Sequence, residues 1–231
     1  SRDLLDADGR SFRYVISAVL ACRRELFEEL GGFDERYVGY GGEDWDLAYR
    51  AWNAGALLVH EPDAVAWHDG PDWAGRPQDL AAKDLETARL AALVPEPSTR
   101  AGAPGGPLPD VLVDVATHDP RCLAALLSQD HRDLQVRRGA PWTADQLARA
   151  RVRVHLDEPV PLAPGAVGDL VARLTDGGLG ELRLHVGGRP VGTAHSSRAL
   201  GRARRWSGRE DDVVARCFGC QDVTVEVLPP A

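Results

Sequence analysis

The stretch GYGGEDWD, residues 39–46, joins a glycine-rich loop to the start of a helix. Glycines in such a loop let the backbone approach a ligand, and acidic side chains at a helix start are favoured by the helix macrodipole. The helical pattern runs from Glu43 to Ala54 and ends at Gly55. Its candidate core positions are Trp45, Leu47, Ala48, Ala51 and Trp52. Taken alone, this local pattern favours a helix cap without chemistry over a functional site.

Further local patterns lie on either side of this helix. Upstream, an apolar, β-compatible run at Tyr14–Ala21 precedes a segment with helical spacing at Arg23–Leu30, which two glycines end. Downstream, we expect strands at Ala56–His60 and Ala64–Trp67, and an amphipathic helix at Gln78–Leu93. The first 94 residues are therefore expected to form one structural region.

Residues 95–109 are rich in proline and glycine and divide the chain. They show no apolar periodicity, so we expect a linker between residues 1–94 and residues 110–231. After it, strand and helix patterns alternate, which predicts a small α/β domain with a mostly parallel sheet. The expected strands are Val111–Ala116, Leu134–Arg137, Val152–Leu156, Leu182–Val186 and Val223–Leu228. The expected helices are Pro120–Gln129, Thr143–Ala150, Ala166–Leu174, Ser196–Trp206 and Asp211–Phe218.

Composition restricts the class of protein. The 231 residues carry a formal net charge of -8, which argues against a nucleic-acid partner because such binding needs basic side chains to neutralise phosphates. The chain has no apolar run of about 18 residues and no signal-peptide pattern, so we expect it to be soluble and cytoplasmic, without a membrane segment. It begins with Ser1 and contains no methionine, so we expect a fragment, and its alanine, glycine and arginine usage is typical of a GC-rich bacterial genome.

Several motifs follow one another in order between residues 15 and 70. They are GGFDE at 31–35, GGED at 41–44, then Asp46, Leu47 and Arg50, and finally Trp67-His68. This order resembles the acceptor-side, C-terminal region of GT-A fold glycosyltransferases, such as beta-galactosyltransferases, chondroitin polymerase and polypeptide N-acetylgalactosaminyltransferases. The implied fold class is α/β, with the acceptor-side half of a GT-A glycosyltransferase followed by the second small α/β domain.

The resemblance implies roles for residues around the glycine-rich loop. In inverting members one carboxylate of the acidic pair deprotonates the acceptor hydroxyl, and we assign Asp44 as this base and Glu43 to binding sugar hydroxyls. The implied substrate-binding residues are Gly41, Gly42, Tyr40, Trp45 and Trp67. The two tryptophans offer faces on which a sugar could stack, although Trp45 is equally well placed for the core.

The resemblance also implies a metal ion and a donor. His68 matches the histidine that, in metal-dependent members, joins the Asp-X-Asp carboxylates around Mn²⁺, or Mg²⁺ in its place, on the diphosphate of a UDP-sugar. A lone histidine after a strand is otherwise more often an ordinary surface residue. The assignment of His68 as a metal ligand therefore depends on the motifs around it.

The nucleotide-binding half that precedes this region in the family has no clear counterpart. Asp6-Ala7-Asp8 is better explained as a turn, and Asp157-Glu158 at an expected strand end lacks the intervening residue. Residues 110–231 resemble a family nucleotide-binding half only loosely, which suggests a degenerate glycosyltransferase-like domain. The basic helix face formed by Arg198, Arg202, Arg204 and Arg205 is expected to be solvated and balanced by Asp211 and Asp212, with a phosphate site as the alternative.

Two hypotheses of different classes follow. The first is an enzyme fragment that lacks its donor-binding half, from a glycosyltransferase that moves a hexose such as galactose from a nucleotide-sugar to a glycan or other hydroxyl acceptor. The second is a catalytically inert module that binds carbohydrate or another protein. A homodimer that completes a site between two chains is a third possibility.

Overall fold

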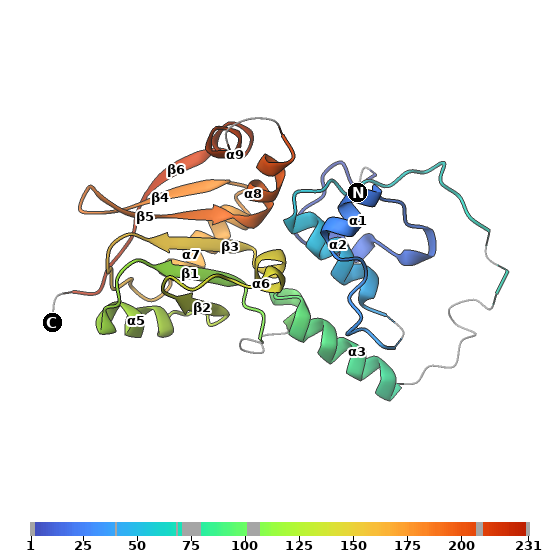
Figure 1. Cartoon of the computed structure of the whole chain (residues 1–231), viewed down its shortest axis with the longest axis horizontal. Helices are drawn as coiled ribbons and strands as arrows, with labels where there is room; N and C mark the ends of the chain where they lie inside the picture. The colour runs from blue at the N-terminus through green and yellow to red at the C-terminus, as the bar shows by residue number, and fades with distance from the viewer. Residues whose placement is uncertain are drawn as a thin grey trace.

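The computed structural model describes residues 3–39, 41–67, 69–70, 80–100, 107–206 and 210–229. Residues up to 100 form a helical N-terminal unit, and residues 107–229 form a unit built on a sheet, here called the sheet unit. The two units lie side by side (Figure 1). None of the described helices has both the length and the apolar character needed to cross a membrane.

Within the described residues, one six-stranded sheet has the order β2-β1-β3-β5-β4-β6. Its strands are β1 (Val111–Val115), β2 (Leu134–Arg137), β3 (Val152–Leu156), β4 (Glu181–Val186), β5 (Arg189–Ser196) and β6 (Cys220–Thr224). Strand β1 pairs in parallel with β2 and β3, and β4 pairs in parallel with β6, whereas β5 runs antiparallel to both of its neighbours. The expected α/β class with a mostly parallel sheet is confirmed.

Strand β5 was not expected from the sequence. It contains Pro190 and Gly192, both of which weaken a strand assignment. The turn Gly187-Gly188, in which both residues have positive φ, joins it to β4, and such a turn suits the twist of a tight hairpin. Gly192 also packs where an added Cβ would lie 2.1 Å from the His155 carbonyl oxygen, so the close approach to β3 requires glycine.

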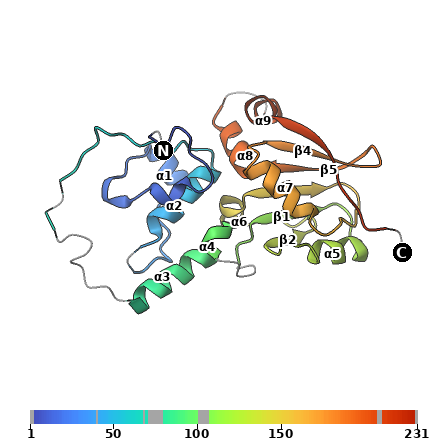
Figure 2. The same cartoon turned by 180° about the vertical axis from the view of Figure 1, so that it is seen from behind.

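Short helices connect these strands: α5 (Pro120–Leu127), α6 (Ala144–Arg149), α7 (Ala166–Thr175), α8 (Ser197–Arg204) and α9 (Glu210–Phe218). The caps explain two of the starts. Asp119 accepts a hydrogen bond from the Cys122 amide, and Thr143 forms a capping box with Gln146. Apolar side chains of α5 and α7 complete the core against the strands, and α7 lies across one face of the sheet (Figure 2).

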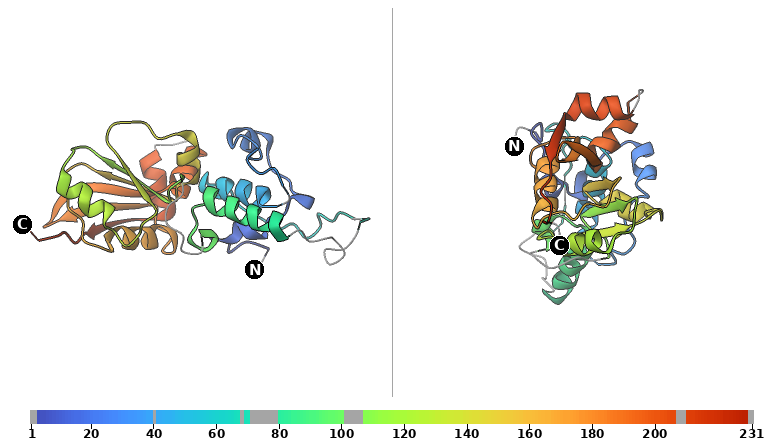
Figure 3. Two further views of the ribbon diagram at one scale, coloured as in Figure 1. Left: turned by 90° about the horizontal axis from the view of Figure 1, so that it is seen from below. Right: turned by 90° about the vertical axis from the view of Figure 1, so that its left-hand side faces the viewer.

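The N-terminal unit is built from two 3₁₀ turns and four helices among its described residues. They are η1 (Ser11–Tyr14), η2 (Ser17–Val19), α1 (Arg24–Glu29), α2 (Glu43–Asn53), α3 (Leu80–Leu93) and α4 (Pro97–Arg100). Phe12 and Tyr49 pack with Leu90 in its small core, and α3 runs alongside α2 (Figure 3). Helix α4 lies within the expected linker, where Arg100 is buried and donates to the carbonyls of Ala91 and Leu108.

The strands expected at Ala56–His60 and Ala64–Trp67 are wrong, because neither segment pairs with a strand among the described residues. The β-compatible run at Tyr14–Ala21 contains the 3₁₀ turn η2 and no strand. A comparison within the chain supplies the reason. Helices α2 and α9 each lead to a glycine of positive φ, Gly55 and Gly219. The segment after Gly219 becomes β6 because β4 lies beside it, whereas in the part of the chain that the structure describes no strand lies beside residues 56–60.

Helix α2 lies at the junction between the two units, against α6 and α8. The basic face of α8 is not solvated as expected. Arg198 donates to the carbonyls of Trp52 and Ala56 and stacks 3.3 Å from the centre of the Trp52 ring, while Arg202 donates to Gly55. Basic donors at the last carbonyls of a helix are favourable, so α8 caps the end of α2.

The approach of α8 to Gly55 gives a testable prediction. Gly55 has φ +82°, and a Cβ added there would lie 2.3 Å from the backbone nitrogen of Arg202. Gly55→Ala should therefore lower the free energy of unfolding by about 1–2 kcal/mol for left-handed strain and further because α8 must move. Gly139→Ala is the control, since Gly139 has φ +64° but nothing within 4 Å of the added carbon. Equal losses in urea unfolding of the two variants would contradict close packing at Gly55.

Candidate acceptor site at the start of α2

Two glycines of positive φ set the start of α2. Gly41 has φ 112° and Gly42, the N-cap, has φ 92°. A Cβ on Gly42 would lie 2.9 Å from the Tyr37 ring, so this position needs glycine both for its backbone conformation and for space. The loop therefore reaches the helix through a turn that places Glu43 and Asp44 in its first residues.

Both carboxylates at this helix start accept backbone hydrogen bonds. Asp44 is half-buried, and its Oδ1 accepts from the Trp45 amide at 2.8 Å while its Oδ2 accepts from the Ser17 amide at 3.1 Å. Glu43 Oε2 accepts from the Gly41 amide at 3.1 Å. Each carboxylate oxygen has a second acceptor position, so Asp44 is held in place and still able to accept from a hydroxyl.

The GGFDE loop is tied to the same helix by Arg50. Its guanidinium donates to the carbonyls of Leu30 at 2.5 Å and Gly32 at 2.8 Å, and it pairs with Asp46 at 2.8 Å. Asp46 is fully buried, with 0% exposure. The sequence motifs include Asp46 and Arg50, but no role was predicted for either. Their four-residue spacing places them on one helix face, and this spacing could have indicated that they pair.

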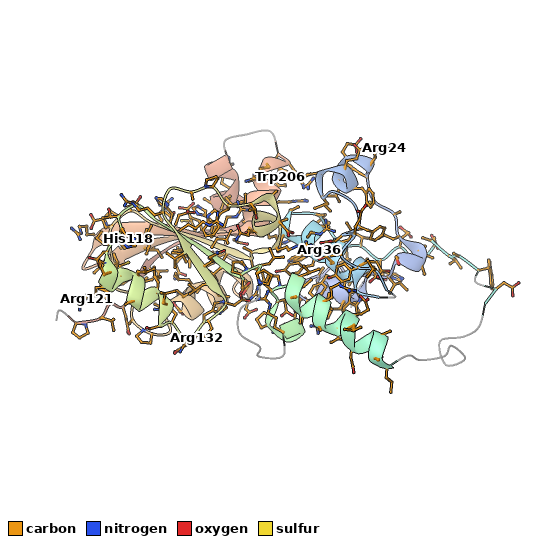
Figure 4. The ribbon with its side chains drawn as sticks, turned by 60° about the horizontal axis from the view of Figure 1, so that its bottom comes forward. Arg24, Arg36, His118, Arg121, Arg132 and Trp206 are labelled. Atoms are coloured by element: carbon orange, nitrogen blue, oxygen red, sulfur yellow. The ribbon has the colours of Figure 1, made fainter. Side chains whose placement is uncertain are left out.

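Asp34 of the GGFDE loop has a perturbed acidity. Hydrogen bonds from the Arg36 side chain, helped by the Arg36 amide and the charge of Arg149, lower the pKa of Asp34 from 3.8 to about 2 against the opposing effect of burial. Figure 4 shows Arg36 at the junction of the two units, where it also pairs with Asp145 at 2.9 Å.

This lowered pKa predicts how stability depends on pH. Because the folded pKa lies below the ordinary value, the ionised Asp34 stabilises the fold fully above about pH 5, and this contribution is lost as pH falls from about 4 to 2. Wild type should therefore lose more unfolding free energy than Asp34→Asn over that range in urea titrations. Parallel pH profiles for the two proteins would show that Asp34 is not coupled to folding.

The structure brings together four of the expected site residues, Gly41, Gly42, Glu43 and Asp44. Trp45 packs edge-on against Phe12, with ring centroids 6.4 Å apart, and borders the small N-terminal core. Trp67 is 97% exposed, so its ring faces are free for stacking. Tyr40 and His68 lie outside the described residues.

A metal site does not form from the described residues alone. They contain no group of three or more His, Cys, Asp or Glu side chains placed to hold a metal ion. Glu43 and Asp44 each keep acceptor positions, but two carboxylates supply fewer ligands than a Mn²⁺ or Mg²⁺ ion requires. His68 and further ligands would have to complete such a site.

Among the described residues, the hollow found in the sheet unit lies away from the start of α2. A hollow of about 180 Å³ lies at the carboxyl ends of β1 and β2, lined by residues that include His118 and Arg138. Figure 4 shows His118 and Arg121 at the end of the sheet unit far from Arg36. At the end of β3, Asp157 contacts His155 at 3.2 Å and Glu158 pairs with Arg189 at 2.7 Å, and all four side chains are exposed.

Part of the chain is similar to known proteins. Residues 9–64 match the family described as the N-terminal domain of galactosyltransferase. This segment is related to glycosyltransferases. The matched segment contains the GGFDE loop, the GGED turn and all of α2.

Individual relatives that match part of the chain are named as glycosyltransferases or as a sugar-polymer synthase. A pre-mycofactocin glycosyltransferase of Mycobacterium tuberculosis is 43% identical over 67 residues, which cover 27% of this chain and 14% of that protein. An N-acetylglucosaminyl-diphospho-decaprenol L-rhamnosyltransferase of the same species is 37% identical over 75 residues, covering 32% of this chain and 24% of that protein. Chondroitin synthase of Escherichia coli is 27% identical over 135 residues, covering 54% of this chain and 20% of that protein. The chain thus spans less than a quarter of the length of these curated relatives.

Proposed function

We propose that this chain is the acceptor-side part of a bacterial, nucleotide-sugar-dependent glycosyltransferase. It would take part in the transfer of a hexose such as galactose to a glycan or another hydroxyl acceptor. The observation that carries the proposal is the Asp44 carboxylate, which the Ser17 and Trp45 amides hold at a glycine-hinged helix start inside the segment related to glycosyltransferases.

Asp44 acts as the general base in this proposal. A sugar hydroxyl is a poor nucleophile, so a carboxylate within hydrogen-bond reach must accept its proton as the new glycosidic bond forms. The two backbone amides orient the carboxylate, and the helix start favours its ionised form. Glu43 would bind hydroxyls of the acceptor or donor, and Trp67 would offer a stacking face.

A UDP-sugar is the proposed donor, with Mn²⁺ or Mg²⁺ as the proposed cofactor. His68 would contribute to holding the ion. When bound, the ion would neutralise charge that develops on the departing diphosphate.

The donor-binding half is proposed to come from other polypeptide sequence, which packs on an apolar face of the N-terminal unit. An apolar hollow of about 110 Å³ lies between residues 15–22, α1, α2 and residues 56–59. Beside it, Leu57 and Val59 are each 62% exposed. In the sheet unit, β6 likewise follows a helix and a glycine of positive φ, and it is paired with a neighbouring strand. This likeness supports the view that a strand of the donor-binding half lies beside residues 56–60.

Isothermal titration and a transfer assay together test the proposal. We expect this chain to bind neither UDP-galactose nor UDP-glucose in the presence of Mn²⁺, and the longer gene product to transfer hexose to one of a panel of p-nitrophenyl glycosides. Sugar binding by the chain without transfer by the longer product would favour an inert binding module. A dimer by light scattering, with donor binding by the chain itself, would instead indicate a site completed between two copies.

A further inference from the structure

Arg149, the last residue of α6, is the most fully bonded side chain at the junction of the two units. Its side chain is 1% exposed. Nε donates to Asp145 at 2.6 Å, one terminal nitrogen donates to Asp46 and to the Leu93 carbonyl, and the other donates to Asp34 at 2.6 Å and to Asp46. These contacts match the five N–H groups of a guanidinium.

The backbone of Arg149 is held by the same helix that its side chain contacts. Its carbonyl accepts from the Tyr49 hydroxyl at 2.7 Å and from the side-chain Nδ2 of Asn53 at 3.2 Å. Asp46, Tyr49 and Asn53 are three and four residues apart, so they lie on one face of α2. One residue of the sheet unit therefore contacts two turns of the helix that begins with Glu43 and Asp44.

The charges around Arg149 make this contact specific. Asp46 is shared between Arg149 and Arg50, and Arg50 in turn holds the carbonyls of Leu30 and Gly32. The Asp34 carboxylate forms ion pairs with both Arg149 and Arg36. A buried charge is tolerated only when it is paired and hydrogen-bonded, so movement of α6 would leave Asp34 and Asp46 short of partners. The position of the sheet unit is thus coupled to the GGFDE loop and to the start of α2.

We propose that Arg149 is a positioning residue, through which the sheet unit fixes the orientation of the GGFDE loop and of the Glu43-Asp44 pair. This assigns residues 107–229 the role of a platform for the acceptor site. The inference deepens the proposed function and rests on it for its catalytic meaning. Its structural part, the coupling of the two units through one guanidinium, stands on contacts alone.

Hydrogen exchange measured by mass spectrometry on this chain tests the coupling. Arg149→Met should speed the exchange of amides in residues 33–39 and 43–50 at least tenfold, because Asp34 and Asp46 lose a shared partner. Amides of β1 and β3 should change less than twofold, since their core contains no part of this network. Arg149→Lys keeps one charge but not the planar fork, and should speed the same amides by about threefold; it carries the test if the methionine variant does not fold.

Arg151 offers a matched control two residues away. It is also largely buried and pairs with Asp110 inside the sheet unit, at 2.6 and 2.7 Å. Arg151→Met should speed exchange in β1 and β3 at least as much as in residues 33–50. The positioning role is wrong if the Arg149 variants leave the amide exchange rates of residues 33–50 within twofold of wild type. It is also wrong if these variants speed exchange in β1 and β3 as much as in residues 33–50.

A kinetic measurement on the longer gene product separates positioning from stability. Arg149→Lys should raise KM for the p-nitrophenyl glycoside acceptor severalfold and leave KM for UDP-galactose unchanged. A residue that only stabilises the fold would reduce the amount of active enzyme and change neither KM, which would overturn the positioning role. If neither the wild type nor any variant transfers hexose, the proposed function fails. The exchange result still decides whether Arg149 couples the two units.

Discussion

In the full-length glycosyltransferase proposed above, Asp44→Asn is expected to lower kcat by about 10³-fold, within the range for loss of a positioned general base. The amide keeps the shape of the carboxylate but cannot take up the hydroxyl proton at neutral pH. It can still accept one of the two hydrogen bonds that Asp44 receives from the Ser17 and Trp45 amides. The fold should therefore survive with a modest loss of stability, and KM for the donor should change little.

Transfer rates with UDP-galactose, measured beside thermal unfolding, provide the check. Asp63→Asn serves as the control, because Asp63 is an exposed carboxylate whose side chain has no described partner. Its rate should remain within twofold of wild type. Turnover by Asp44→Asn close to that of the control would remove Asp44 from the base role, and a collapsed fold would show that the residue is needed first for structure.

Asp46→Ala is expected to lower the free energy of unfolding by about 3–5 kcal/mol, the usual effect of removing one partner from a buried ion pair. Asp46 has no exposed surface and accepts from both Arg50 and Arg149. The alanine variant leaves two guanidinium groups short of a counter-charge in a place that water does not reach. Urea unfolding followed by tryptophan fluorescence should show a single large shift of the midpoint.

The control for this change is Asp169→Ala. Asp169 forms a pair with Arg173 of the same spacing, four residues apart on a helix, but both side chains are substantially exposed. An exposed pair contributes about 0.3–0.5 kcal/mol, so the control should shift little. Comparable small losses in the two variants would mean that water or other groups replace Asp46 and that the junction is less tightly coupled than its contacts indicate.

Local patterns predicted most of the helices of this protein and the alternating order of the sheet unit. Helix α2 was predicted within one residue of its end because apolar spacing and Gly55 are both local signals. Two expected strands in the N-terminal unit, at residues 56–60 and 64–67, were wrong for the opposite reason. A strand requires a neighbour, and the apolar run at residues 56–60 cannot show whether one is present. Strand β5 was missed because its partners, not its own composition, stabilise it.

The sequence by itself determined the local geometry of the GGED turn, since glycines of positive φ and acids at a helix start act through bonds made within a few residues. Only the tertiary structure decided what surrounds it. Arg149 lies 103 residues beyond Asp46 along the chain, and Arg198 lies 142 residues beyond Ala56. Such pairs form because burial makes an unpartnered charge or carbonyl unfavourable, a constraint that depends on which surfaces meet after folding.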